Sequence, residues 1–307
     1  MKSFLSAADF TRDELLQLFA VAADLKQRWK AGRREAPLAG RTLAFVSEKP
    51  SLRTRVTFEV GMVQLGGRAV YLAGTEIGMG ARESVQDVAR NLSRWVDGIA
   101  ARVFAHATVV SLARHASIPV VNALCDVEHP CQAFADFFTL WERGVDLGAM
   151  RLGWIGDGNN VCHSVMLMGA LFGASLAVAC PPGYEPEPSV QARVRRLGGR
   201  LSITHDPRDA ATGADVLYTD VWTSMGQEQQ RVQRLEAFAR FQINDTVVRF
   251  AKPSALVMHC LPAHRGEEIT DAVLDGPQSI VLDQAENRLH AQKAILLHLL
   301  GDAVDDV

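Results

Sequence analysis

The chain has 307 residues, of which 48% are hydrophobic and 22% charged, a composition typical of a folded globular protein. Its formal net charge of −3 at pH 7 gives no electrostatic case for binding nucleic acid or an anionic membrane. No apolar run approaches the ~20 residues of a membrane-spanning helix, and the first residues are too polar for a signal peptide. We therefore expect a cytoplasmic protein of two domains, or one large α/β unit, without nucleic-acid or membrane partners.

The first half of the chain predicts one helix and then strands and helices in alternation. Thr11 is placed to cap the first helix, and Asp13 and Glu14 follow in its first turn. Short apolar runs after it are typical of buried strands, and the segments between them have a helical period. We expect strands at 42–46, 69–72, 99–104 and 119–121, and helices after Ser51, Arg82, His106 and Pro130.

The same alternation restarts in the second half, with strands expected at 152–155, 176–179, 201–204, 216–219, 256–258 and 280–282. The two series predict an α/β protein of two doubly wound parallel-sheet domains, with the active site in the cleft between them. Glycines at 144 and 148 interrupt the helical pattern, so we place the domains at 1–142 and 143–284. A final helix, residues 285–307, is expected to pack back on the first domain.

Residues 51–55, Ser-Leu-Arg-Thr-Arg, have the pattern of an anion-binding helix start. Ser51 can cap the helix, whose first turn then presents free backbone N–H groups at the positive end of the helix dipole. With the Thr54 hydroxyl and the Arg53 guanidinium, these groups could hold a phosphate. Taken alone, such a pattern is more often a capped helix with solvated arginines.

Two further segments place polar side chains at a strand end and a helix start. Arg102 ends a predicted strand, where ligands bind in parallel sheets, although an arginine that reaches solvent is an equally good interpretation. Pro130 suits the first position of a helix, which leaves His129 at the N-cap and Gln132 beside it. Both side chains can donate to a carbonyl or phosphate oxygen, but a lone His-Pro is more often a turn.

The second half carries comparable signals. The turn Gly-Asp-Gly-Asn-Asn at 156–160 lacks the G-x-G-x-x-G spacing, so it predicts a strand-to-helix turn and not a dinucleotide site. Asp220 ends a strand, where a carboxylate can pair with a ligand ammonium, and the Ser-Met-Gly sequence at 224–226 suits a mobile loop. A plain loop is the simpler interpretation of that segment.

Cys260 follows another predicted strand and is one of five cysteines. Their odd number, with no Cys-x-x-Cys pair, argues against a disulfide framework or a zinc site and is typical of reduced, mostly buried thiols in the cytosol. Cys260 could be a nucleophile, but a buried inert thiol is commoner. Glu-Asn-Arg at 286–288 alone indicates only a polar helix start.

In this order, the segments resemble the ornithine carbamoyltransferase family over nearly the whole chain. The shared motifs are Ser-x-Arg-Thr-Arg, His-Pro-x-Gln, Gly-Asp-Gly-Asn-Asn, Asp-x-x-x-Ser-Met-Gly, His-Cys-Leu-Pro and Glu-Asn-Arg. The resemblance implies an enzyme of arginine metabolism that joins carbamoyl phosphate to the δ-amine of L-ornithine, giving citrulline and phosphate. It also implies a homotrimer, or a larger assembly of trimers, with shared active sites and with no metal or cofactor.

The resemblance assigns the site residues by position. Carbamoyl phosphate would be bound by Ser51, Leu52, Arg53, Thr54, Arg102, His129, Gln132, Cys260, Leu261 and Arg288. Ornithine would be bound by Asn160, Asp220, Ser224 and Met225. Arg102, His129, Asp220 and Cys260 would be catalytic. The donors would stabilise charge on the carbonyl oxygen, and the thiol would orient the amine without forming an acyl-enzyme.

Two positions depart from the family pattern. Leu52 stands where the phosphate loop usually has threonine, so one hydroxyl is missing, and relatives that act on acylated ornithines can also have leucine there. Glu76 stands where a neighbouring subunit often contributes glutamine to the phosphate site, and a carboxylate beside phosphate would be repulsive.

The alternatives are a carbamoyltransferase for an acylated ornithine, putrescine or aspartate, and a non-catalytic paralogue that binds carbamoyl phosphate. Asp220 and the 224–226 loop favour a free α-amino acid over its blocked or decarboxylated analogues. The same loop lacks the basic residues expected for a dicarboxylate. The joint presence of Arg53, Arg102 and His129 with Asp220 and Cys260 argues against a non-catalytic role.

Overall fold

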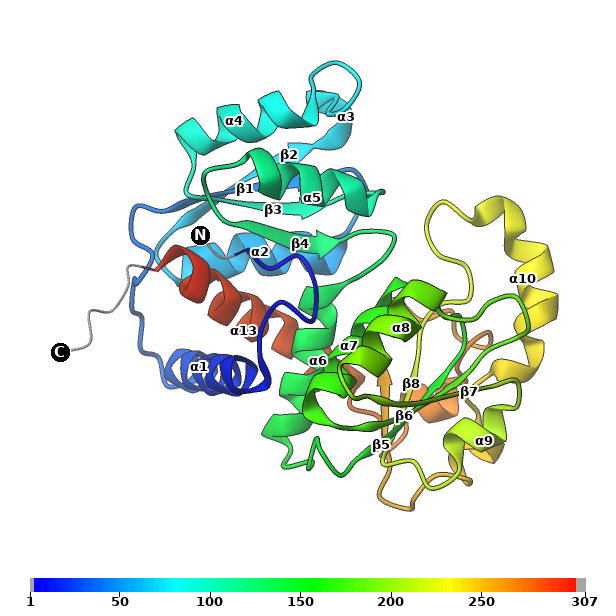
Figure 1. Ribbon diagram of the computed structural model, residues 1–307. Helices are drawn as coiled ribbons and strands as arrows, with labels where there is room; N and C mark the ends of the chain where they lie inside the picture. The colour runs from blue at the N-terminus through cyan, green and yellow to red at the C-terminus, as the bar shows by residue number, and fades with distance from the viewer. Residues whose placement is uncertain (1–2, 302–307) are drawn as a thin grey trace. The chain divides into compact units, whose positions relative to one another are not determined.

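The computed structural model describes residues 3–301, which divide by their internal contacts into two compact units. Within these residues, unit 1 comprises 3–138 and 286–301, and unit 2 comprises 139–285. Each unit is built around its own parallel sheet (Figure 1). Positions 302–307 of the expected final helix lie outside the described residues.

The sheet of unit 1 has the strand order β2-β1-β3-β4, with all strands parallel. Its strands are β1 (Thr42–Ser47), β2 (Arg68–Ala73), β3 (Gly98–Arg102) and β4 (Val120–Leu124). The helices are α1 (Arg12–Lys30), α2 (Leu52–Gln64), α3 (Gly74–Ile77), α4 (Val85–Trp95), α5 (His106–His115), α6 (Pro130–Glu142) and α13 (Val281–Leu300). Helix α6 contains the boundary at 138/139 between the two units, and helix α13 contains the boundary at 285/286.

Side chains that alternate along the strands explain the two helix layers of unit 1. Val46 of β1 joins a buried cluster with Leu92 of α4 and Leu112 of α5. The neighbouring Phe45 packs on α2, where its ring centroid lies 5.6 Å from that of Phe58. Figure 1 shows α4 and α5 on one side of this sheet and α2 and α13 on the other.

The sheet of unit 2 has the order β7-β6-β5-β8-β9, again all parallel. Its strands are β5 (Arg151–Ile155), β6 (Ser175–Ala179), β7 (Arg200–Thr204), β8 (Val216–Thr219) and β9 (Leu256–His259). The α-helices are α7 (Asn160–Phe172), α8 (Pro188–Arg196), α9 (Pro207–Ala211), α10 (Arg231–Phe238), α11 (Asp245–Val248) and α12 (Asp271–Leu274). Two short 3₁₀ helices are η1 (Glu228–Gln230) and η2 (Ala239–Phe241).

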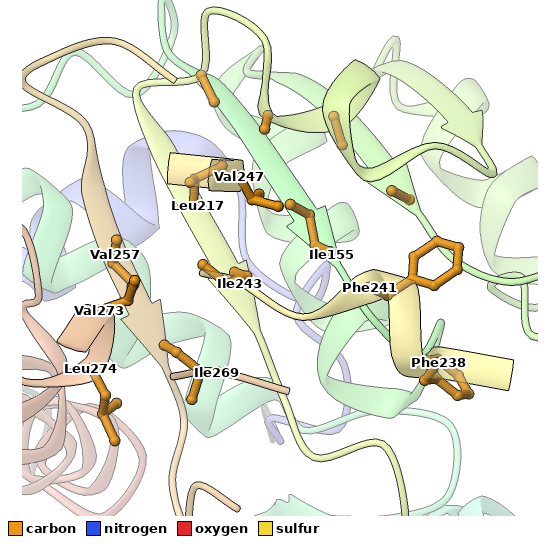
Figure 2. Packing of buried hydrophobic residues seen from close by; sticks show 14 of the residues in the cluster. Ile155, Leu217, Phe238, Phe241, Ile243, Val247, Val257, Ile269, Val273 and Leu274 are labelled. Carbon is orange, nitrogen blue, oxygen red and sulfur yellow. The ribbon is translucent and has the colours of Figure 1, made fainter. Parts of the chain in front are cut away.

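A hydrophobic core covers one face of this second sheet (Figure 2). Ile155 of β5 and Leu217 of β8 belong to this core, together with Phe238 of α10. On α7, a Cβ at Gly169 would stand 2.8 Å from the Leu176 side chain of β6. The absence of a side chain at this glycine therefore lets α7 pack closely on its sheet.

The sheet orders confirm the prediction of two doubly wound parallel-sheet domains. The strand expected at 280–282 is wrong, because α13 begins at Val281 and only an isolated bridge joins Ser279 to Val257. A three-residue apolar run is too short to distinguish a strand from the start of a buried helix. The strand expected to reach 104 ends at Arg102. Among the helices of the described chain, none is both long and apolar enough to cross a membrane.

Candidate active site

In each unit, several candidate residues follow the carboxyl ends of strands that lie at, or next to, the point where the strand order reverses. The reversal lies between β1 and β3 in unit 1, and between β5 and β8 in unit 2. Ser47 and Arg102 are register partners at the end of β1 and β3, and Thr219 and His259 are partners at the end of β8 and β9. Ligands bind at such reversal points in open parallel sheets.

The start of α2 has the predicted cap. Ser51 is extended, with φ −160° and ψ 120°, and its hydroxyl accepts the Thr54 N–H at 3.1 Å. The first turn contains no acidic side chain, so nothing in it offsets the positive end of the helix. Arg55 is engaged elsewhere, because its guanidinium stacks 3.8 Å from the Tyr71 ring centroid and pairs with Glu59 at 2.9 Å.

Arg288 of α13 joins two of the sequence motifs of unit 1. Its Nη2 lies 3.3 Å from the Thr54 hydroxyl, and its Nη1 donates to the Gln132 carbonyl oxygen. The Gln132 amide nitrogen donates to Asp136 at 2.7 Å, which orients the carbonyl oxygen for Arg288. All four side chains are buried. The structure thus brings together Thr54, Gln132 and Arg288, which lie in three separate motifs.

His129 lies among three cationic side chains, those of Arg53, Arg102 and Arg288. Burial lowers the pKa of His129 well below 6.5, and the charges of Arg288, Arg102 and Arg53 lower it further. His129 and Arg102 are each only 5% exposed. All three guanidinium groups lie close enough to lower the pKa of this one imidazole. Together they form a site suited to a multiply charged anion.

Asp220 is the centre of the polar group in unit 2. Its Oδ2 accepts the Asn159 side-chain N–H at 2.8 Å, and its Oδ1 accepts the Val221 N–H at 2.8 Å. The Cys260 thiol also donates to Oδ1, at 2.9 Å. Asp220 is 6% exposed, so three donors surround a buried carboxylate.

The other predicted ornithine ligands are less closely assembled. Asn160 is the first residue of α7, directly after the cap residue Asn159. The Ser224 N–H donates to the Gln227 side chain at 3.0 Å, and Met225 is exposed. Across residues 3–301, no hydrogen bond connects Ser224 or Met225 to Asp220.

Four of the five cysteines are buried, and Cys260 is the half-buried one. Burial raises the pKa of Cys131 and of Cys180 to about 12, which makes both thiols poor nucleophiles at neutral pH. Cys260 is followed by Leu261, whose φ of 58° lies in the left-handed region.

A buried ion pair in unit 2 was not indicated by the sequence. Arg234 of α10 donates to the Asp157 carboxylate and, through Nε, to the Trp222 carbonyl oxygen. It therefore connects the turn after β5 to the segment after β8. Burial raises the pKa of Asp157 to about 7, although the charge of Arg234 acts in the opposite direction. No local pattern marks Arg234, because its partner lies 77 positions earlier in the chain.

Among residues 3–301, two groups of side chains offer three potential metal-ligand atoms within 4.8 Å of one another: Asp220, His259 and Cys260; and His264, Glu267 and Glu268. Both ring nitrogens of His259 are already engaged, by the Leu261 N–H and by Glu268. Glu267 forms an ion pair with Arg231. Each group therefore has a ligand already committed to another protein atom.

The two parallel sheets, the cationic group at one reversal point and the carboxylate and thiol at the other define a two-domain α/β enzyme. The chain belongs to the aspartate/ornithine carbamoyltransferase family. The family's carbamoyl-P binding domain matches residues 2–142, and its Asp/Orn binding domain matches residues 149–299.

Similar proteins extend over almost the whole chain. The ornithine carbamoyltransferase of Geobacillus stearothermophilus is 51% identical over 303 residues, covering 97% of both proteins. The structure of ornithine carbamoyltransferase from Pyrococcus furiosus matches with 47% identity and a TM-score of 0.94, covering 97% of each chain. An N-acetyl-L-ornithine transcarbamylase matches with 31% identity and a TM-score of 0.89, covering 97% of this chain and 100% of that one.

Proposed function

We propose that the chain transfers the carbamoyl group of carbamoyl phosphate to the δ-amine of L-ornithine, giving L-citrulline and phosphate. The observation that carries the proposal is the buried contact of Arg288 with Thr54 and Gln132, which unites three family motifs. The identities of 51% and 47% to proteins named for ornithine, against 31% to one named for N-acetylornithine, support the unblocked acceptor.

In this proposal, unit 1 binds carbamoyl phosphate. The backbone N–H groups at the start of α2, with Arg53 and Thr54, hold the phosphate, and Arg102 bridges phosphate and carbonyl oxygens. His129 stays neutral because its pKa is lowered, so it stabilises the carbonyl oxygen as a hydrogen-bond donor and not as a proton source. Removing one such donor typically costs ~3 kcal/mol in the transition state.

Unit 2 binds the amino acid. Asp220 would attract the ornithine cation, with Asn160, Ser224 and Met225 as further ligands and the Cys260 thiol beside the side-chain amine. The neutral δ-amine then attacks the carbonyl carbon, the carbon–oxygen bond to phosphate breaks, and the departing phosphate takes the amine proton. Carbamoyl phosphate is already activated, so this sequence of bonds needs no redox step.

We also propose that the chain assembles as a trimer, or as a larger assembly of trimers, through two apolar surfaces of unit 1. The first, the α2 stripe, consists of Leu52, Val56, Val60 and Val63, which are exposed on one face of the helix. Contiguous exposed apolar surface of this kind is typical of protein interfaces.

The second surface is the β2–α4 groove, a cavity of about 390 Å³. It is lined by Thr42, Ala44, Val70, Leu72, Ile77, Glu83, Val88, Asn91, Leu92, Trp95 and Val96. Because stripe and groove are different surfaces, a stripe seated in a neighbour's groove makes a head-to-tail contact that can close into a ring. Glu76 is exposed on α3, beside the groove-lining Ile77, so the neighbouring copy would also meet this unusual residue.

Two variants test this contact. Val63→Glu disrupts the stripe and Trp95→Glu disrupts the groove, so light scattering should show a trimer for the native chain and monomers for each variant. An equimolar mixture should form dimers, because one intact stripe and one intact groove remain. Val232→Glu, at an equally exposed valine of unit 2, is the control and should remain trimeric. A trimer of either single variant would contradict the proposed contact.

A panel of acceptors tests the activity. With carbamoyl phosphate, the purified protein should carbamoylate ornithine far faster than acetylornithine, succinylornithine, putrescine or aspartate. A faster rate with an acylated ornithine would show that the acylated compound is the acceptor. Leu52, which such relatives can also have, would then be the first residue to substitute. On the same basis we propose a role in arginine biosynthesis in the cytoplasm.

A further inference from the structure

His259 and Glu268 form a pair with no exposed side-chain surface in unit 2. His259 ends β9, directly before Cys260, and its Nε2 lies 3.1 Å from Glu268 Oε1. On the other side of the ring, His259 Nδ1 accepts the Leu261 N–H at 2.8 Å. The same Glu268 oxygen also accepts the His264 backbone N–H. Through these hydrogen bonds the pair connects the end of β9 to Leu261 and His264 in the segment that follows.

The hydrogen bonds assign the tautomer of His259. The Leu261 N–H points its hydrogen at Nδ1, so Nδ1 carries none, and the neutral ring bears its proton on Nε2. That proton is donated to Glu268. Glu268 therefore favours the tautomer of His259 whose Nδ1 can accept the Leu261 N–H. The other tautomer would place two hydrogens between Nδ1 and the Leu261 nitrogen.

Leu261 depends on this contact because its φ of 58° is a conformation that non-glycine residues rarely adopt. Such a conformation persists only where surrounding contacts enforce it. The preceding residue, Cys260, donates its thiol hydrogen to Asp220 Oδ1 at 2.9 Å. Relaxation of Leu261 would rotate the chain at this point and displace the thiol from Asp220.

We propose that His259 and Glu268 are positioning residues, which hold Leu261 in its left-handed conformation and thereby fix Cys260 beside Asp220. The relevance to catalysis rests on the proposed function, in which Asp220, Cys260 and Leu261 meet the substrates. The geometry of the segment itself does not depend on that function.

Substitutions of His259 separate its two contacts. His259→Asn places an amide oxygen near the position of Nδ1, where it can accept the Leu261 N–H. His259→Gln places its amide near the position of Nε2, where it reaches Glu268 but not Leu261. The Asn change is combined with Glu268→Gln, so that no buried carboxylate loses its donor. Three quantities are measured: kcat/KM for ornithine, the rate of Cys260 alkylation by iodoacetamide, and the dissociation constant of inorganic phosphate.

The His259→Asn/Glu268→Gln variant should stay within about threefold of the native kcat/KM, because the Leu261 contact is kept. His259→Gln should lose about tenfold or more, mainly in kcat, and its Cys260 alkylation rate should change several-fold. Both should bind inorganic phosphate with native affinity, because the residues proposed to hold the phosphate group, Ser51, Arg53 and Thr54, belong to unit 1. Equal kcat/KM and equal alkylation in the two variants would overturn the proposal.

A second matched pair serves if a His259 variant does not fold. Glu268→Gln still accepts the Nε2 hydrogen and should remain near native activity, whereas Glu268→Leu cannot and should reproduce the loss of His259→Gln. Equal activities here would also refute the role of Glu268. If the native chain produces no citrulline, the proposed function fails, and the alkylation rates alone still decide whether His259 positions Cys260.

Discussion

Arg288 Nη2 lies 3.3 Å from the Thr54 hydroxyl oxygen, although 234 positions separate the two residues in the chain. The same guanidinium also donates to Gln132. Helix α13 therefore supplies a charged side chain to the proposed anion site of unit 1, in addition to packing on its sheet.

Replacing Arg288 with methionine should weaken carbamoyl phosphate binding by about ten- to a hundredfold, the effect expected for a lost charge-assisted contact. Isothermal calorimetry measures the change directly. The matched control is Arg55→Met, which removes a guanidinium that contacts Tyr71 and Glu59 and should leave the affinity within about twofold. Equal losses in the two variants would show that net charge alone governs the affinity.

Replacing Asp220 with asparagine should lower kcat/KM for ornithine by about ten- to a hundredfold or more. Three donors face the two carboxylate oxygens, so an amide nitrogen at either position meets a donor and leaves it without an acceptor. Phosphate affinity should stay within about twofold, because Asp220 belongs to unit 2. An unchanged rate with ornithine would remove Asp220 from the site.

Replacing Arg234 with methionine should destabilise the protein by about 3–5 kcal/mol, because it leaves the buried Asp157 without its cationic partner. Urea unfolding at pH 8 measures this loss. The double variant Arg234→Met/Asp157→Asn should recover part of the stability, since it removes the buried charge. No recovery would mean that the Trp222 contact of Arg234, and not the ion pair, carries the effect.

Replacing His290 with glutamine should make stability less dependent on pH below neutrality. Burial, followed by the charges of Lys293 and Lys26, lowers the pKa of His290 from 6.5 to about 4. Between these values the unfolded chain binds the proton and the folded chain does not, so stability falls as pH drops from 6.5 to 4. The loss from this group approaches about 3 kcal/mol, and the variant should lack it in urea titrations at successive pH values.

The strand positions and the ends that carry polar residues could be predicted because local pattern determines them. Ser51 caps α2 and Pro130 starts α6, as expected from the residue types at those positions. The prediction of a strand at 280–282 was wrong because the apolar residues Ile280 and Val281 fit a buried strand and a buried helix start equally well. The residues from Val281 onward form helix α13.

Two buried pairs of unit 2, Arg234–Asp157 and His259–Glu268, could not be predicted in this way. Arg234 and Asp157 meet only because α10 and the turn after β5 are brought together by the fold of unit 2. His259 is visible in the sequence as part of a motif, but its tautomer depends on Glu268, and a glutamate in a polar segment has no pattern that marks it as buried. Both pairs are recognised by their burial, which the residue types alone do not reveal.

The final helix of unit 1 follows unit 2 in the chain, so the residues of the proposed anion site are synthesised in a fixed order. Thr54 and Gln132 leave the ribosome first, and Arg288 follows only after all of unit 2 has been made. At ordinary elongation rates that interval is roughly ten to thirty seconds. In a nascent chain of this protein, every strand of unit 2 is therefore synthesised before the proposed anion site of unit 1 can be completed.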